Sequence, residues 1–133
     1  MTGSKKLRIA GWVLSVLVAA LFIFMSAPMK FSEWEGKEKA FEEMGYKSDV
    51  MFKIGIVEVA AAVLFLIPQT GFLGAILLTG YLGGATATHV RIGQPFIIPV
   101  IIGVVVWIAY GLRRPEVFKL LYCSRCAPAS ETP

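Results

Sequence analysis

Cysteine and histidine are nearly absent from this sequence of 133 residues, which holds two cysteines, Cys123 and Cys126, and one histidine, His89. Because both cysteines lie close to the C-terminus, no disulfide framework links the body of the chain, and its stability must come from helix packing. A lone histidine with no cysteine nearby gives little support to a histidine-bound metal or haem. We therefore expect no metal site.

Charged residues are also scarce. They make up 17% of the sequence, whereas apolar residues make up 56%, and the mean hydropathy is +0.70. This composition is more apolar than the surface of a water-soluble protein of this size allows, and it indicates contact with the lipid bilayer. The net charge of +4 comes from basic residues that flank apolar runs. Nucleic acid is therefore not an expected partner.

Four apolar segments each approach the length that crosses a bilayer once their flanks are counted. We expect transmembrane helices near residues 9–28, 51–67, 72–89 and 96–112. The second and third must form a tight antiparallel hairpin, because only a short turn with a proline and a glycine joins them. The prediction is an all-α integral membrane protein, with an antiparallel four-helix transmembrane bundle in residues 1–114 and a tail in residues 115–133.

The orientation follows from the distribution of lysine and arginine, which favour the cytoplasmic side of short flanks. Both ends of the chain are rich in them, whereas the segment between the first two spans mixes its lysines with more acids. We therefore expect both termini, and the tail, to be cytoplasmic. The first apolar segment follows Lys5, Lys6 and Arg8 as a signal peptide would, but it is longer than a typical signal-peptide core, so we interpret it as a retained helix.

A short amphipathic helix is expected between the first and second spans. Ser32 and Glu35 have the spacing of a capping box, and Gly45 offers a C-terminal stop. An apolar side with Trp34 and Phe41 is typical of a helix that lies on the membrane surface, so this helix should cover the outer end of the bundle. The alternative is a solvated, charged loop.

Glu58 lies well inside the second apolar segment and is the most informative residue for function. A carboxyl at that depth should face the bundle interior, where it must be paired or protonated. Counting residues from the tight turn places Tyr81 level with it on the third helix. With Tyr81 as its nearest expected partner and no cation beside it, Glu58 should be protonated at neutral pH. The alternative role is structural, a carboxyl that locks helix packing.

Glycines near this level favour a close approach of the second and third helices. Gly55 precedes the acidic residue, and Gly80, Gly83 and Gly84 surround the tyrosine. Small residues allow the backbones of membrane helices to come close together. We therefore expect the two helices to touch there.

Further polar residues follow at turn spacing along the third helix and at its end. The expected ligand-binding residues are Glu58, Tyr81, Thr88, His89 and Arg91. Arg91 is equally compatible with an anionic ligand and with an acid of the outer loop. His89 is also compatible with a purely structural hydrogen bond.

The Cys123-Ser124-Arg125-Cys126 motif leaves three interpretations open. It is a redox pair, half of a zinc site completed by another chain, or part of a plain reduced tail, and no βαβ context supports the first. The extramembrane segments contain no phosphate loop, nucleophile elbow or paired carboxylates. No catalytic residue is assigned, and we expect no catalysis by this chain alone.

The second and third segments also carry a recognisable pattern. Glu58 is followed by the run Gly-Gly-Ala-x-x-Thr-His-x-Arg that ends at Arg91, and residues 24–30 read FMSAPMK. Together these features resemble the DoxX-like family of small bacterial membrane proteins, over about the first 112 residues. The resemblance implies a four-helix bundle in the bacterial cytoplasmic membrane.

The family takes its name from a membrane subunit of a thiosulfate:quinone oxidoreductase. The resemblance therefore implies a membrane subunit or helper of a redox complex, with an oxidoreductase partner and a quinone or similar amphiphile bound within the bundle. The alternatives are a non-enzymatic carrier or binding protein for a small apolar or anionic molecule, which would require a homo-oligomer for transport, and a membrane scaffold.

Overall fold

The computed structural model describes residues 2–122, which contain helices, turns and loops but no strand. The first long helix has three parts, α1 (Thr2–Ala20), η1 (Leu21–Ser26) and α2 (Ala27–Phe31). After it come α3 (Lys37–Met44), α4 (Ser48–Leu66), α5 (Gly71–Arg91), α6 (Ile97–Arg113) and α7 (Glu116–Tyr122). The all-α prediction is confirmed. The Cys123–Cys126 motif lies outside the described residues.

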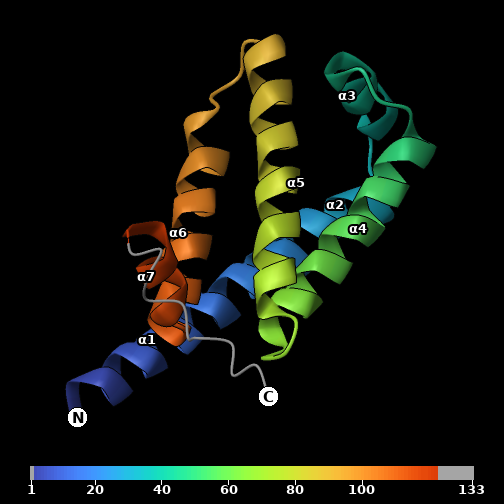
Figure 1. Ribbon diagram of the computed structural model, residues 1–133. Coiled ribbons are helices and arrows are strands. Elements are labelled where there is room, and N and C mark those ends of the chain that lie inside the picture. Colours follow the sequence, from blue (N-terminus) through green and yellow to red (C-terminus); the bar gives the residue numbers. More distant parts are fainter. Residues whose placement is uncertain (1, 123–133) are drawn as a thin grey trace, which may run out of the picture.

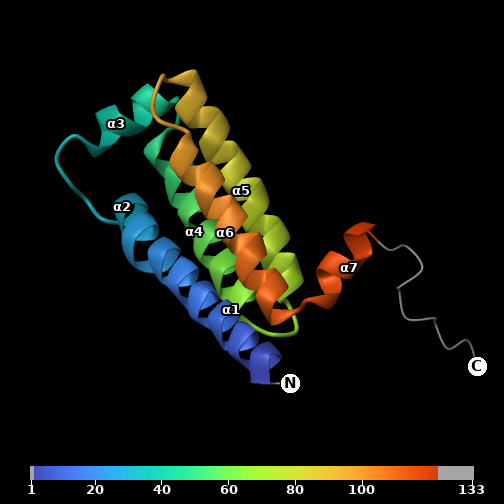
Figure 2. The same cartoon turned by 90° about the vertical axis from the view of Figure 1, so that its left-hand side faces the viewer.

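The long helices pack side by side, with α4 and α5 joined by a tight turn and α6 packed against α5 (Figure 1). The first helix crosses this group obliquely in the view of Figure 1 and lies along one side of it in Figure 2. Its α1 part packs mainly on α6, whereas η1 and α2 pack on α4. The C-terminal end of the first helix is thereby brought against the middle of α4.

Two helices are long and apolar enough to cross a membrane by length and composition, Ser4–Phe31 and Gly71–Arg91, while Ile97–Arg113 is a shorter apolar helix. The outward side chains are largely apolar; Phe24 is 76% exposed and Ile98 is 64% exposed. Exposed apolar surface of this extent is typical of contact with lipid. Crossing of the membrane by all four helices remains a prediction.

The widened turn η1 explains how the first helix continues past Pro28. A proline inside an α-helix has no N–H and collides with the carbonyl one turn earlier. In η1 the hydrogen bonds span five residues, as between the Ala27 N–H and the Phe22 carbonyl, and Pro28 falls at the start of α2. The chain therefore stays helical to Phe31, three residues beyond the expected end of the helix.

The short helix between the first two spans is present as α3, and Gly45 ends it with a left-handed φ of 85°. The predicted capping box is wrong, because Ser32 is extended after α2 and α3 begins at Lys37 after the left-handed Gly36. Lys37 of α3 forms an ion pair with Glu33 of the preceding loop, with Nζ 3.1 Å from Oε1.

The prediction about the glycines is only partly right. A Cβ at Gly55 would lie 2.9 Å from the Phe31 ring, and a Cβ at Gly74 would overlap the backbone of Phe65, so close approaches occur there. At Gly80, Gly83 and Gly84, in contrast, a Cβ would meet nothing within 4 Å. The tight contact between α4 and α5 therefore lies beside their turn and not around Tyr81.

Candidate functional site

A buried ion pair joins the first helix to α4. The Nζ atom of Lys30 lies 2.8 Å from Oε2 of Glu58, and the two residues are 8% and 0% exposed. Glu58 therefore faces the bundle interior, as expected. A charge pair in such a place is retained only when its geometry is good and its other polar atoms find partners.

Contacts within the first helix and with α4 position Lys30. On its own helix, its ammonium group also donates to the Ser26 hydroxyl at 3.0 Å and to the Ser26 carbonyl at 3.3 Å. Gly55 lies one turn before Glu58, and a Cβ there would be 3.3 Å from Cβ of Lys30. The absence of a side chain at Gly55 thus lets α2 come close enough for the ammonium group to reach the carboxylate.

Tyr81 completes the cluster from α5. Its ring centroid lies 5.7 Å from Nζ of Lys30, and its ring makes an edge contact of 5.8 Å with Phe22. We call these three residues, Lys30, Glu58 and Tyr81, the ion-pair site. The site joins side chains from α2, α4 and α5.

Two expectations about Glu58 assumed that no cation lies beside it, and this assumption is wrong. Its hydrogen-bonded partner is Lys30 at 2.8 Å, not Tyr81. The expected protonated carboxyl depended on the lack of a nearby cation, and Lys30 places one in direct contact. Sequence reasoning missed Lys30 because it placed this lysine in the loop after the first helix.

The polar atoms of the ion-pair site are not all satisfied. The Lys30 ammonium group has one acceptor for each of its three N–H bonds. Oε1 of Glu58, in contrast, is buried with no hydrogen-bond partner among the described residues. A buried oxygen without a donor is unfavourable, since it has lost water and gained nothing in exchange. This oxygen therefore has the capacity to accept a further hydrogen bond.

Thr88, His89 and Arg91 do not join this cluster. Thr88 accepts a hydrogen bond from the Tyr46 hydroxyl at 3.2 Å, and Nδ1 of His89 donates to the Ala85 carbonyl at 2.7 Å. The Arg91 guanidinium donates to the Met44 carbonyl. Of these three, Thr88 and Arg91 hold α3 and the residues after it against the end of α5. Pairing with an acid of the loop, one of the two alternatives for Arg91, is not seen among the described residues, where the guanidinium makes this backbone contact.

A second buried cation, Arg113, lies at the opposite end of the bundle. Its Nη1 atom donates to the Ser15 hydroxyl at 3.1 Å and to the Phe65 carbonyl at 2.8 Å, and its guanidinium carbon lies 3.8 Å from the Trp12 ring centroid. Stacking on aromatic faces is a common way to hold an arginine. Sequence reasoning used Arg113 only as a charge for topology and did not predict its burial.

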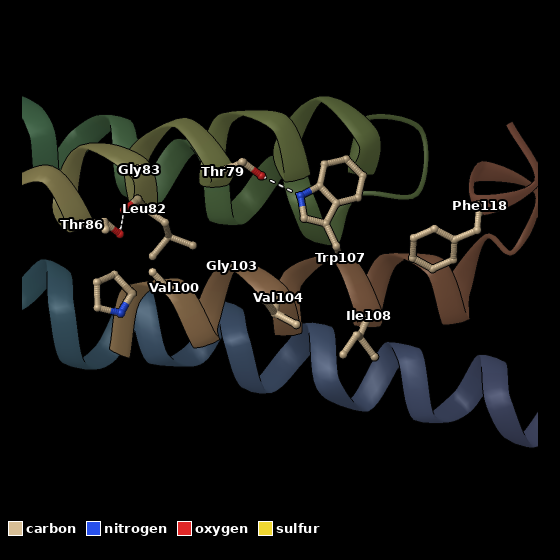
Figure 3. Close-up of a pocket in the computed structure, with 11 residues that line it drawn as sticks. Thr79, Leu82, Gly83, Thr86, Val100, Gly103, Val104, Trp107, Ile108 and Phe118 are labelled. Atoms are coloured by element: carbon tan, nitrogen blue, oxygen red, sulfur yellow. Dashed lines mark hydrogen bonds between the residues drawn. The ribbon is translucent and has the colours of Figure 1, made fainter. Parts of the chain in front are cut away.

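An apolar groove of about 450 Å³ runs between α5 and α6 on the outside of the bundle (Figure 3). Its main polar groups are already paired; Trp107 Nε1 donates to the Thr79 hydroxyl at 2.9 Å, and the Thr86 hydroxyl donates to the Leu82 carbonyl. Phe118 of α7 closes one end. A groove with these walls suits an alkyl or isoprenoid chain.

No group of three or more metal-ligating side chains lies together in the part of the chain that the structure describes. The chemistry available in the ion-pair site is therefore hydrogen bonding and charge: an ammonium group, a carboxylate with one open oxygen, and a phenol. These groups can hold the polar end of an amphiphile while the surrounding side chains exclude water.

Comparison with known proteins adds one result. The model of a family described as DoxX-like matches residues 13–109, which is well over half of the chain and includes all three residues of the ion-pair site. No curated protein and no solved structure matches the chain.

Proposed function

Because the chain belongs to the DoxX-like family, we propose that this membrane protein serves as a subunit or helper of a redox complex and binds a quinone or similar amphiphile at the ion-pair site. The observation that carries the proposal is the unpaired Oε1 of Glu58, which is buried beside an ammonium group and a phenol. In this proposal the chain contributes binding and orientation, and its partner oxidoreductase contributes catalysis.

The residues of the site suit the two oxygen atoms of such a ligand. Oε1 of Glu58 accepts a hydrogen bond from a hydroxyl group of the reduced quinol, and the Tyr81 phenol donates to a carbonyl oxygen of the oxidised quinone. A bound quinone supplies two-electron, two-proton redox chemistry. The Lys30 ammonium group orients the Glu58 carboxyl group, and the apolar rings of Phe22 and Phe31 lie beside the site and limit access of water.

Thr88, His89 and Arg91 take a different role in this proposal from the one expected. They lie at the end of α5, where Thr88 and Arg91 contact Tyr46 and Met44 near the end of α3. We assign Thr88 and Arg91 to holding α3 and the residues after it over this end of the bundle, His89 to a hydrogen bond within α5, and the ligand contacts to the ion-pair site.

The groove between α5 and α6 favours a second candidate function, a non-enzymatic carrier or binding protein for a small apolar molecule. Its walls are apolar and its hydroxyl groups are internally paired. The two candidates differ in their polar contacts. A quinone ligand depends on the ion-pair site, whereas a purely apolar ligand is insensitive to it.

The test is to purify the protein from bacterial membranes in mild detergent and identify bound lipids and quinones by mass spectrometry. We expect quinone to co-purify with the parent protein and to be lost from the double variant Lys30→Met/Glu58→Leu. The matched control is Asp49→Asn/Lys53→Met, which removes an exposed ion pair of α4 and should retain quinone. Absence of quinone from the parent, together with no thermal shift from quinone analogues, would overturn the proposal.

The partner is tested in the same material. Proteins that co-purify from native membranes should include an oxidoreductase subunit, and cross-linking in membranes shows whether a homo-oligomer forms. An apolar ligand that survives in Lys30→Met/Glu58→Leu, with no oxidoreductase recovered, favours the carrier.

A further inference from the structure

A hollow of about 590 Å³ lies where α1 begins and α6 ends, at the opposite end of the bundle from α3. Among the residues that line it are Lys5, Leu7, Arg8, Arg113, Arg114 and Glu116. It thus combines basic side chains from the first helix with others from the end of α6 and the turn that follows. The ion-pair site and the apolar groove contribute none of these residues.

The charge in this hollow is strongly unbalanced. Four cationic side chains and one carboxylate line it, and Nε of Arg114 donates to Oε1 of Glu116 at 2.6 Å. A hydrogen bond from its own backbone N–H lowers the pKa of Glu116, so this carboxylate stays ionised and compensates one cation. Lys5, Arg8 and Arg113 remain without an ion-pair partner among the described residues.

The buried Arg113 distinguishes this hollow from a group of exposed lysines and arginines. It is 3% exposed, its Nε is buried without a hydrogen-bond partner, and no described carboxylate lies within ion-pair distance. A buried charge with no counter-charge is unfavourable unless an anion is supplied from elsewhere. Its side chain is held by contacts with Ser15, Phe65 and Trp12, and the residue also lines the hollow.

We propose that this hollow binds the phosphate group of an anionic phospholipid. A phosphodiester is a compact anion that arginine binds through paired hydrogen bonds, and basic hollows between the ends of membrane helices suit such headgroups. A lipid fits better than free phosphate because apolar side chains adjoin the cations; Leu7 is 56% exposed beside Lys5 and Arg8. The proposal requires only that this end of the bundle lies at the membrane surface, and it does not depend on quinone binding.

The experiment uses full-length protein in a neutral detergent, to which phosphatidylglycerol, phosphatidylcholine or inorganic phosphate is added. We expect phosphatidylglycerol to raise the thermal unfolding temperature and to remain bound in native mass spectrometry, whereas phosphatidylcholine should do so at least tenfold more weakly. The double variant Lys5→Gln/Arg8→Gln should lose most of this preference while unfolding at the parent temperature in the absence of lipid.

The matched control is Lys39→Gln/Lys47→Gln, which removes the same charge from exposed positions near the opposite end of the bundle. It should keep the preference for phosphatidylglycerol. An equal response to inorganic phosphate would mean that free anions are the ligand and would overturn the lipid assignment. Equal loss in both double variants would show that net charge alone attracts the lipid, and would overturn the site itself.

Discussion

Lys30 and Glu58 each carry a charge that the apolar bundle tolerates only in the presence of the other. Removing one partner of a buried ion pair typically destabilises a protein by about 3–5 kcal/mol, whereas replacing both with apolar residues is often near neutral. We therefore expect Lys30→Met and Glu58→Leu each to lower the unfolding temperature in detergent. The double variant Lys30→Met/Glu58→Leu should recover most of the loss.

Infrared spectroscopy provides the control for this prediction. The parent protein should show no protonated-carboxyl band from Glu58 at neutral pH, because the ammonium group lies 2.8 Å away. In Lys30→Met the band should appear, and in Lys30→Met/Glu58→Leu it should be absent again. Additive destabilisation in the double variant, with a protonated-carboxyl band already present in the parent, would mean that the two residues are not ion-paired.

Glycine at position 74 is required by packing, whereas glycine at position 84 is not. A Cβ at Gly74 would overlap the backbone of Phe65, and one at Gly84 would meet nothing within 4 Å. Overpacking of this kind costs about 1–3 kcal/mol, whereas alanine is a better helix former than glycine. Gly74→Ala should therefore lower the unfolding temperature, and Gly84→Ala should leave it unchanged or slightly higher. Equal effects of the two variants would contradict the helix contact beside the turn.

At the residue level, the sequence was sufficient to predict the burial of Glu58, because a carboxyl in an apolar helix is more stable in the bundle interior than in lipid. It was not sufficient to find Lys30. The Ser-Ala-Pro at residues 26–28 suggested the end of a helix, and proline usually marks one. The available signal was the four-residue spacing from Ser26 to Lys30, which places both side chains on one helical face.

Among the elements, α3 depends on a contact from a distant part of the chain. The Arg91 guanidinium binds the carbonyl of Met44, the last residue of α3, and stacks 5.8 Å from the Tyr46 ring centroid. A hydrogen bond to a charged group contributes about 1.5–3 kcal/mol. We expect Arg91→Ala to speed backbone hydrogen exchange in α3 about tenfold or more, with little change in α4.

The control for this prediction is Lys39→Ala, which removes an exposed cation from α3 itself. It should leave exchange in α3 near the parent rate. If both variants speed exchange equally, the stability of α3 comes from its own charges and not from its contact with Arg91.

The boundaries of the elements show what local sequence signals can and cannot decide. Gly45 ended α3 as predicted, because a left-handed residue after a helix is most easily glycine. The start of α3 was missed, since Ser32 follows α2 without a break and has no free helix to cap. The π-turn η1 lies just before Pro28 and packs on α4, and nothing in residues 21–26 alone distinguishes it from an α-helix.

For the whole molecule, composition was enough to predict an all-helical chain with helices that fit a membrane. The number of crossings is less simple, because α4 carries Asp49, Lys53 and Glu58 within its 19 residues. The packing of α4 against the apolar α5 is a tertiary contact, and the hydropathy of α4 alone does not predict it. The four-span arrangement therefore needs a direct measurement of which segments lie on each side.

Thiol labelling in cells provides that measurement. We expect a membrane-impermeant reagent to label native Cys123 and Cys126 only after the membrane is permeabilised, because both termini are predicted to be cytoplasmic. In a variant whose two cysteines are replaced by serine, a new cysteine introduced as Lys39→Cys should react in intact spheroplasts. Labelling of the tail and the loop from the same side would rule out four crossings.

The ion pair also constrains how the molecule is made. Lys30 and Glu58 are 28 residues apart, so the lysine leaves the ribosome before the glutamate does. Lys30 lies one residue before the end of the first helix, and a long cationic side chain near a helix end can reach the lipid–water boundary until its partner arrives. We therefore expect the first helix to reach its final depth only when α4 packs beside it, which would couple the insertion of the two segments.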